Sequence, residues 1–177
     1  MKPIKIIIGI LLSSLILVGS YYAYNLFINP ISPWESVEYK SEGKEIYISY
    51  YRPYKKERLI FGQAADGALV PYGKYWRLGA NLTTKIITNQ NLDIAGRKLP
   101  KGTYGLYSYP HAENWVLVIH ETTGRISFSE PDSNGIIMKI NIPVQAIDKP
   151  LEQFTIDFIG SSIRMRWDST KVIIPIN

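Results

Sequence analysis

The sequence predicts an all-β domain, an antiparallel β-sandwich or flattened barrel, preceded by a single N-terminal transmembrane helix. Two observations carry this prediction. The opening stretch is long, apolar and uncharged, and beyond residue 38 short segments alternate between apolar and polar side chains. Alternation with a period of two is typical of strands with one buried face, and no sustained helical period follows residue 30. We expect an anchor at 1–28, a linker at 29–37 and a β domain at 38–177.

The opening stretch is long enough to cross a bilayer. Residues 6–28 contain no charged side chain, and Lys2 and Lys5 precede them. A helix of this length spans about 34 Å, close to the ~30 Å of bilayer hydrocarbon. The two lysines favour a cytoplasmic N-terminus, which places the domain in the periplasm as part of a single-pass inner-membrane protein. The alternative is a signal peptide cleaved near Ser20, which would leave a secreted domain.

Prolines mark the linker, and turn signals divide the domain that follows. Pro30 and Pro33 disfavour helix across the linker. Six alternating segments beyond it are expected to be strands: 46–50, 115–119, 138–144, 154–158, 163–167 and 172–176. Chain reversals are expected at Ala95-Gly96, Pro100-Lys101-Gly102, Thr123-Gly124, Asn134-Gly135 and Gly160-Ser161-Ser162. Strands at this spacing describe a sandwich or barrel.

Composition excludes several kinds of chemistry. The chain has no cysteine, so disulfides, thiolate catalysis and cysteine metal sites are excluded. The net charge is +5, and without Lys2 and Lys5 the remaining 18 basic and 15 acidic residues leave only +3. So small an excess does not indicate nucleic-acid binding. We expect no cofactor.

Residues 51–81 differ from the strands around them. They are rich in glycine, proline, arginine and aromatic residues, and they do not alternate. We expect an ordered loop with one short helical turn, anchored by Leu59, Ile60, Phe61, Leu69 and Val70. Between Arg52 and Lys85 there are seven basic and two acidic residues, a local charge of +5. Long loops in compact domains are usually functional or disordered.

Six residues of this region are the candidate ligand contacts: Arg52, Tyr72, Lys74, Trp76, Arg77 and Asn81. Arginine offers a planar fork for carboxylate or phosphate, and an aromatic ring offers a stacking face. The structural alternative is that Arg52 and Arg77 pair with acids or cap loop carbonyls while Trp76 plugs the core. In that alternative Gly73 and Gly79 only allow unusual backbone angles.

The same residues resemble a family signature. The matching motifs are Tyr51-Arg52-Pro53, Ile60-Phe61-Gly62, Leu69 to Lys74, Trp76-Arg77, Gly79-Ala80-Asn81 and, later, Gly102-Thr103-Tyr104, Trp115 and Trp167-Asp168. Over residues 38–177 the chain resembles the family called domain of unknown function 2911. That resemblance implies an exported bacterial β domain and no established activity, substrate or cofactor. Leu82 departs from the family, which often has glutamate there, so no role given to that carboxylate applies to this chain.

Other catalytic motifs are weak or absent. His120-Glu121 begins like a zinc-protease motif, but the second histidine is missing and a strand precedes it. Structural roles are expected for His111 and His120, and no metal site is expected. No nucleophile elbow or phosphate-binding glycine motif occurs. Asp157 and Asp168 are expected on solvated strand faces.

The sequence therefore favours a non-catalytic, membrane-anchored domain of the bacterial envelope. Its expected partners are the membrane, through residues 6–28, and a polar or anionic ligand: an anionic small molecule, a glycan or an envelope protein. One alternative is a hydrolase or lyase in which Arg77 stabilises charge and Asp66 or His111 carries the proton. Another is a purely structural envelope component.

Overall fold

The computed structural model describes residues 2–27, 31–124 and 129–177, and it divides into two units, Met1–Pro33 and Trp34–Asn177. The first unit contains helix α1 (Lys2–Phe27). Within it, Pro3–Asn25 is 23 residues long with a mean hydropathy of 2.1. By length and composition this segment can cross a membrane, as a signal sequence also can. The apolar helix is thus confirmed, while its retention and the side on which the domain lies stay predictions.

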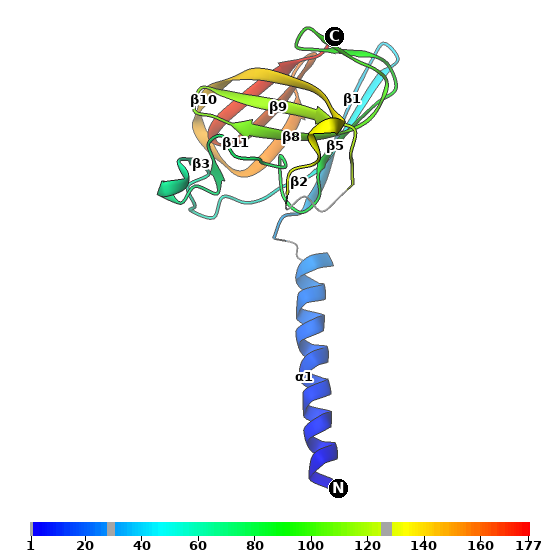
Figure 1. The fold of residues 1–177 in the computed structure, drawn as a ribbon, viewed down its shortest axis with the longest axis vertical. Helices are drawn as coiled ribbons and strands as arrows, with labels where there is room; N and C mark the ends of the chain where they lie inside the picture. The colour runs from blue at the N-terminus through cyan, green and yellow to red at the C-terminus, as the bar shows by residue number, and fades with distance from the viewer. Residues whose placement is uncertain (1, 28–30, 125–128) are drawn as a thin grey trace. The chain divides into compact units, whose positions relative to one another are not determined.

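The second unit is built on one curled antiparallel sheet (Figure 1). Its strand order is β1-β2-β5-β8-β9-β10-β11. The strands are β1 (Trp34–Ser41), β2 (Lys44–Tyr51), β5 (Thr84–Thr88), β8 (Gly102–Pro110), β9 (Asn114–His120), β10 (Ile136–Phe158) and β11 (Ser162–Pro175). Strands make up 53% of the structure and the sheet forms a half-barrel, which confirms the all-β prediction. β1 begins at Trp34, inside the stretch expected to be linker.

One long strand, β10, takes the place of two that the sequence predicts. Segments 138–144 and 154–158 were expected to be separate, but both belong to β10, which runs for 23 residues. Its first part pairs with β9 and its second part with β11. Register shifts between Ala146 and Leu151, and again between Leu151 and Thr155, bend the strand. These bulges interrupt the alternation, which is why the sequence shows two segments.

A single hydrophobic core packs the buried face of the sheet against two smaller pieces. One piece is the chain between β2 and β5, which contributes Ile60, Val70, Trp76 and Leu78. The other is the hairpin of β6 (Leu92–Ile94) and β7 (Arg97–Leu99). The backbone of Ile94 bridges to Ile176, next to the end of β11, and so attaches the hairpin to the sheet. Together they cover the apolar face of the half-barrel.

A side chain near the end of β2 and the backbone that follows it close the gap that the curl leaves beside β10. The Tyr50 hydroxyl donates to the Ile156 carbonyl at 3.1 Å and accepts from the Ile156 N–H at 2.8 Å. The Phe154 N–H donates to the Pro53 carbonyl at 3.0 Å. Unpaired strand edges expose backbone groups that need partners. Here a tyrosine side chain and an irregular backbone segment supply them.

Candidate functional site

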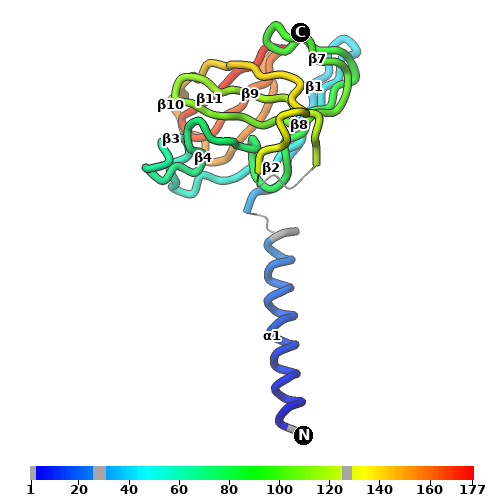
Figure 2. Tube along the Cα trace, viewed as in Figure 1, coloured from blue at the N-terminus to red at the C-terminus, as the bar shows by residue number. Residues whose placement is uncertain are grey.

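Residues 52–83, here called the 52–83 loop, are ordered, as the sequence predicts. The loop contains β3 (Phe61–Gly62), the short 3-10 helix η1 (Ala64–Asp66) and β4 (Val70–Pro71). Helix η1 is the expected helical turn. Strands β3 and β4 pair in parallel, and Figure 2 shows this part of the loop projecting beyond the curled sheet. Backbone pairing therefore fixes the loop.

The apolar residues of the loop divide between the core and the surface. Ile60 and Val70 are buried, and Phe61 packs against the core. Leu59 and Leu69, also expected to be anchors, are 45% and 42% exposed. Their backbones still meet, because the Leu69 N–H donates to the Leu59 carbonyl at 2.9 Å. Three of the five expected anchors thus act through their side chains.

Trp76 is the largest contribution of the loop to the core. It is 7% exposed, and its backbone exchanges two 2.8 Å hydrogen bonds with Ser108 of β8. Its ring centroid lies 5.2 Å from that of Trp115, 5.0 Å from that of Phe154 and 6.0 Å from that of Trp167. The ring faces are taken up by these neighbours, as the structural alternative for Trp76 describes.

Arg52 also serves the fold. Its Nε donates to the Phe154 carbonyl at 3.2 Å and its Nη2 to the Thr155 hydroxyl at 3.0 Å. Its Nη1 lies 3.1 Å from a carboxylate oxygen of Glu35 on β1. A planar guanidinium can satisfy three such acceptors at once. Arg52 therefore ties β1 and β2 to β10, with an acid and a carbonyl as its partners.

Tyr72 and Lys74 lie on a firmly held turn. The Lys74 N–H donates to the Pro71 carbonyl at 3.2 Å, and Gly73 has a φ of 70°, as the third residue of a type II turn requires. The Tyr72 N–H donates to the Gly62 carbonyl at 2.8 Å, and the Gly73 N–H to the Pro110 carbonyl at 2.7 Å. These bonds fix the turn against β3 and the end of β8.

The turn presents a lysine to solvent beside a histidine. Lys74 is exposed, and its ammonium contacts no acid among the described residues. A Cβ atom added to Gly73 would come within 3.5 Å of His111 Cε1, so the exposed His111 borders the turn. Tyr72 is half-buried there.

Arg77 and Asn81 belong to a second turn, just past Trp76. The Arg77 Nη1 donates to the Asn81 carbonyl at 3.2 Å. Gly79 has a φ of 138°, and a Cβ atom there would lie 2.5 Å from the Tyr51 carbonyl oxygen, so only glycine fits. Asn81 is exposed with a left-handed φ of 56°, which asparagine tolerates well. Lys74 and Arg77 are three positions apart in the chain, so their Cα atoms are at most about 10 Å apart.

Other basic residues of the loop have structural partners. Lys55 Nζ lies 2.5 Å from an Asp168 carboxylate oxygen. The guanidinium of Arg58 donates to the carbonyls of Lys55 and Tyr54. Lys55 therefore holds the loop on β11, and Arg58 stabilises the local fold of the loop. Lys74 is one of the cations that face solvent.

Asp157 and Asp168 are partly exposed on β10 and β11, and both are also ion-paired there. Asp157 lies 2.8 Å from Arg164 Nη2 and 2.6 Å from Arg166 Nη2, across the β10–β11 hairpin. Burial pushes the pKa of Asp157 upward, but the hydrogen bonds and charges of both arginines outweigh burial and lower that pKa. The Asp157–Arg164 pair follows from strand register, in which the two residues are opposite. A register built back from the Gly160 turn would have found it.

His120 has a structural role. It is 1% exposed, its Nδ1 accepts from the Thr122 N–H at 2.9 Å, and its Nε2 lies 2.7 Å from the Asp132 carbonyl oxygen. Since Nδ1 accepts, Nε2 carries the proton and donates. Across residues 2–27, 31–124 and 129–177, no three His, Asp or Glu side chains gather as a metal site.

Comparison with known proteins gives one match. Residues 32–176 match the model of a family described as protein of unknown function (DUF2911). The match covers nearly all of the Trp34–Asn177 unit, and it confirms the resemblance drawn from the loop motifs. No curated protein and no solved structure gives a significant match.

Proposed function

The chain belongs to the DUF2911 family, and because the description of that family assigns no activity, we propose a function from the geometry of the chain itself. The chain is a non-catalytic binding domain, tethered by α1 and placed outside the cytoplasm. It binds a polar or anionic ligand on a surface formed by Tyr72, Lys74, Arg77 and Asn81, here called the loop surface.

The observation that supports this proposal is a pair of rigid turns presenting polar groups. The turn at 71–74 is held by three backbone hydrogen bonds, and the turn at 77–81 is held by Arg77 and by close contact with Tyr51. A surface fixed in advance loses little conformational entropy when it binds. Arg52 and Trp76 contribute indirectly, because they hold the loop to the sheet and core.

The chemistry of the loop surface suits an acidic glycan. Lys74 supplies a point charge for a carboxylate, and the side-chain amide of the exposed Asn81 suits sugar hydroxyls. The ring of Tyr72 offers an apolar face of the kind that packs against a sugar ring. A glycan carrying carboxylates would use all of these groups together.

Binding of polygalacturonate, with neutral dextran for comparison, tests the proposal on the full-length protein in lipid nanodiscs. Lys74→Ala/Arg77→Ala is expected to weaken polygalacturonate binding at least about tenfold, since each charge-assisted contact contributes about 1.5–3 kcal/mol. Arg97→Ala/Lys98→Ala removes the same charge from exposed residues of β7 and is the matched control. Tryptophan fluorescence checks that both variants are folded.

Equal binding by Lys74→Ala/Arg77→Ala and the parent protein would refute the loop surface. So would equal binding of polygalacturonate and dextran, because the charge would then have no role. Cleavage of the polymer that disappears in His111→Ala would instead favour the hydrolase or lyase alternative.

A further inference from the structure

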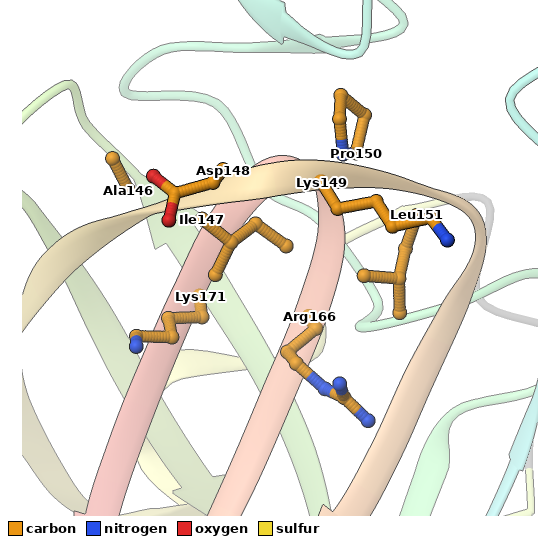
Figure 3. A pocket seen from close by; sticks show the side chains of 8 residues that line it. All are labelled: Ala146, Ile147, Asp148, Lys149, Pro150, Leu151, Arg166 and Lys171. Atoms are coloured by element: carbon orange, nitrogen blue, oxygen red, sulfur yellow. The ribbon is translucent and has the colours of Figure 1, made fainter.

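A hollow of about 500 Å³ lies where β10 bulges away from β11. Ala146 pairs with Thr170, and the next pair along the strands is Leu151 with Asp168. Residues 147–150 of β10 therefore face only Ser169 of β11. Extra residues on one strand bend it outward and leave a gap in the ladder. We call this hollow the bulge pocket (Figure 3).

The charge of the bulge pocket is mainly positive. Lys149, Arg166 and Lys171 line it, against one acid, Asp148. Within the described parts of the chain, neither Lys149 nor Lys171 forms an ion pair or a side-chain hydrogen bond. An anion entering the pocket would therefore meet cations that have no competing protein partner.

Arg166 adds an unsatisfied donor. Its Nη2 is bonded to Asp157 at 2.6 Å, but its Nε is buried and has no acceptor among the residues that the structure describes. A buried donor without a partner costs about 1–3 kcal/mol. Because Nε is buried, Arg166 contributes to the pocket through the charge of its guanidinium, which Asp157 partly balances.

Apolar side chains separate the cations. In Figure 3, Ile147 lies between Lys171 and Arg166, and Leu151 lies between Arg166 and the ammonium end of Lys149. The cations therefore do not converge on one point, as they would around a simple inorganic ion. The pocket volume falls in the range of small-molecule sites, about 300–1,000 Å³. Its occupant has to combine an anionic group with an apolar body.

We propose that the bulge pocket binds a small organic anion, a carboxylate or phosphate carried on an apolar body. The apolar body packs on Ile147 and Leu151, and the anionic group contacts one of the cations at the rim. The pocket is formed by β10 and β11, so it is separate in residues from the loop surface and does not depend on it.

Titration calorimetry with 2-naphthoate, with the uncharged 2-naphthamide for comparison, tests this proposal on the full-length protein in nanodiscs. Empty nanodiscs correct for partition into lipid. We expect saturable binding of one naphthoate, about tenfold weaker in Lys149→Ala/Lys171→Ala, which corresponds to about 1.4 kcal/mol. Lys98→Ala/Lys101→Ala is the control with the same charge change at exposed sites.

Three results would overturn the proposal: no saturable heat above that of empty nanodiscs, equal affinity for naphthamide, or unchanged affinity in Lys149→Ala/Lys171→Ala. The two lysines have no described partners, so their replacement is expected to leave the fold intact, which tryptophan fluorescence checks. Naphthoate binding is also expected to persist in Lys74→Ala/Arg77→Ala. That result would show that the bulge pocket binds independently of the loop surface.

Discussion

Two buried tyrosines of this domain differ in the hydrogen bonding of their hydroxyl groups. Tyr50 and Tyr107 are 2% and 0% exposed. The Tyr50 hydroxyl forms two hydrogen bonds to the backbone of Ile156, while the Tyr107 hydroxyl has no partner in the described ranges. Burial raises the pKa of both side chains, that of Tyr107 to about 12. Only Tyr50 uses its hydroxyl to hold strands together.

Replacing each tyrosine by phenylalanine tests this difference. Tyr50→Phe leaves an N–H and a carbonyl of β10 unpaired and is expected to lower the free energy of unfolding by about 2 kcal/mol. Tyr107→Phe removes a hydroxyl without a described partner and is expected to change that free energy by less than about 0.5 kcal/mol. Urea unfolding followed by tryptophan fluorescence measures both. Equal losses would show that Tyr50 does not close the gap beside β10.

At the scale of single residues, the sequence indicates which residues matter better than it indicates which partners they contact. It marks Arg52 as noteworthy and leaves two roles open, ligand contact and pairing with an acid. The partner Glu35 lies on β1, in the stretch expected to be linker, so the pair could not be anticipated. Asp157, Arg164 and Arg166 come together only through cross-strand register. Register depends on bulges and turns, which alternation alone does not define.

At the scale of elements, the 52–83 loop is part of the core as much as of the surface. Trp76 joins the loop to an aromatic cluster that includes Trp115, Phe154 and Trp167. The turns on either side of Trp76 carry Lys74 and Arg77. Order in the loop surface is therefore coupled to packing beneath it.

Substitution of Trp76 tests that coupling. Trp76→Ala leaves a large cavity and is expected to lower the free energy of unfolding by about 3–5 kcal/mol. Trp34→Ala is the control, because Trp34 is 55% exposed and its loss is expected to cost less than about 0.5 kcal/mol. Urea unfolding of both variants decides the matter. A small effect of Trp76→Ala would contradict a core role for the loop.

The elements themselves are partly predictable. Apolar alternation identifies segments of β2, β9, β10 and β11, but it misses β1, β5 and β8 and divides β11 into two segments. Gly160 with Ser161-Ser162 identifies the β10–β11 turn, where the Ile159 N–H donates to the Ser162 carbonyl at 2.9 Å. The continuity of β10 is not predictable, because its two register shifts against β11 break the pattern that defines a strand. The bulge pocket is a product of the same shifts, so alternation gives no sign of it.

At the scale of the whole molecule, local sequence patterns account for the fold class, and long-range contacts account for the curl of the sheet. An apolar helix and an alternation with a period of two are properties of short segments, and both are predicted correctly. The half-barrel curl depends on contacts between β2 and the edge of β10, about a hundred residues away in the chain. No short segment encodes such contacts.

The function proposed for the loop surface depends on a β domain that lies outside the cytoplasm. The chain has no cysteine, so one introduced thiol reports its side of the membrane without background. Lys98→Cys places that thiol on an exposed position of β7, and Lys5→Cys places it before the uncharged stretch of α1. A membrane-impermeant maleimide applied to intact spheroplasts is expected to label Lys98→Cys, and to label Lys5→Cys only after lysis. Labelling of Lys98→Cys only after lysis would contradict the account.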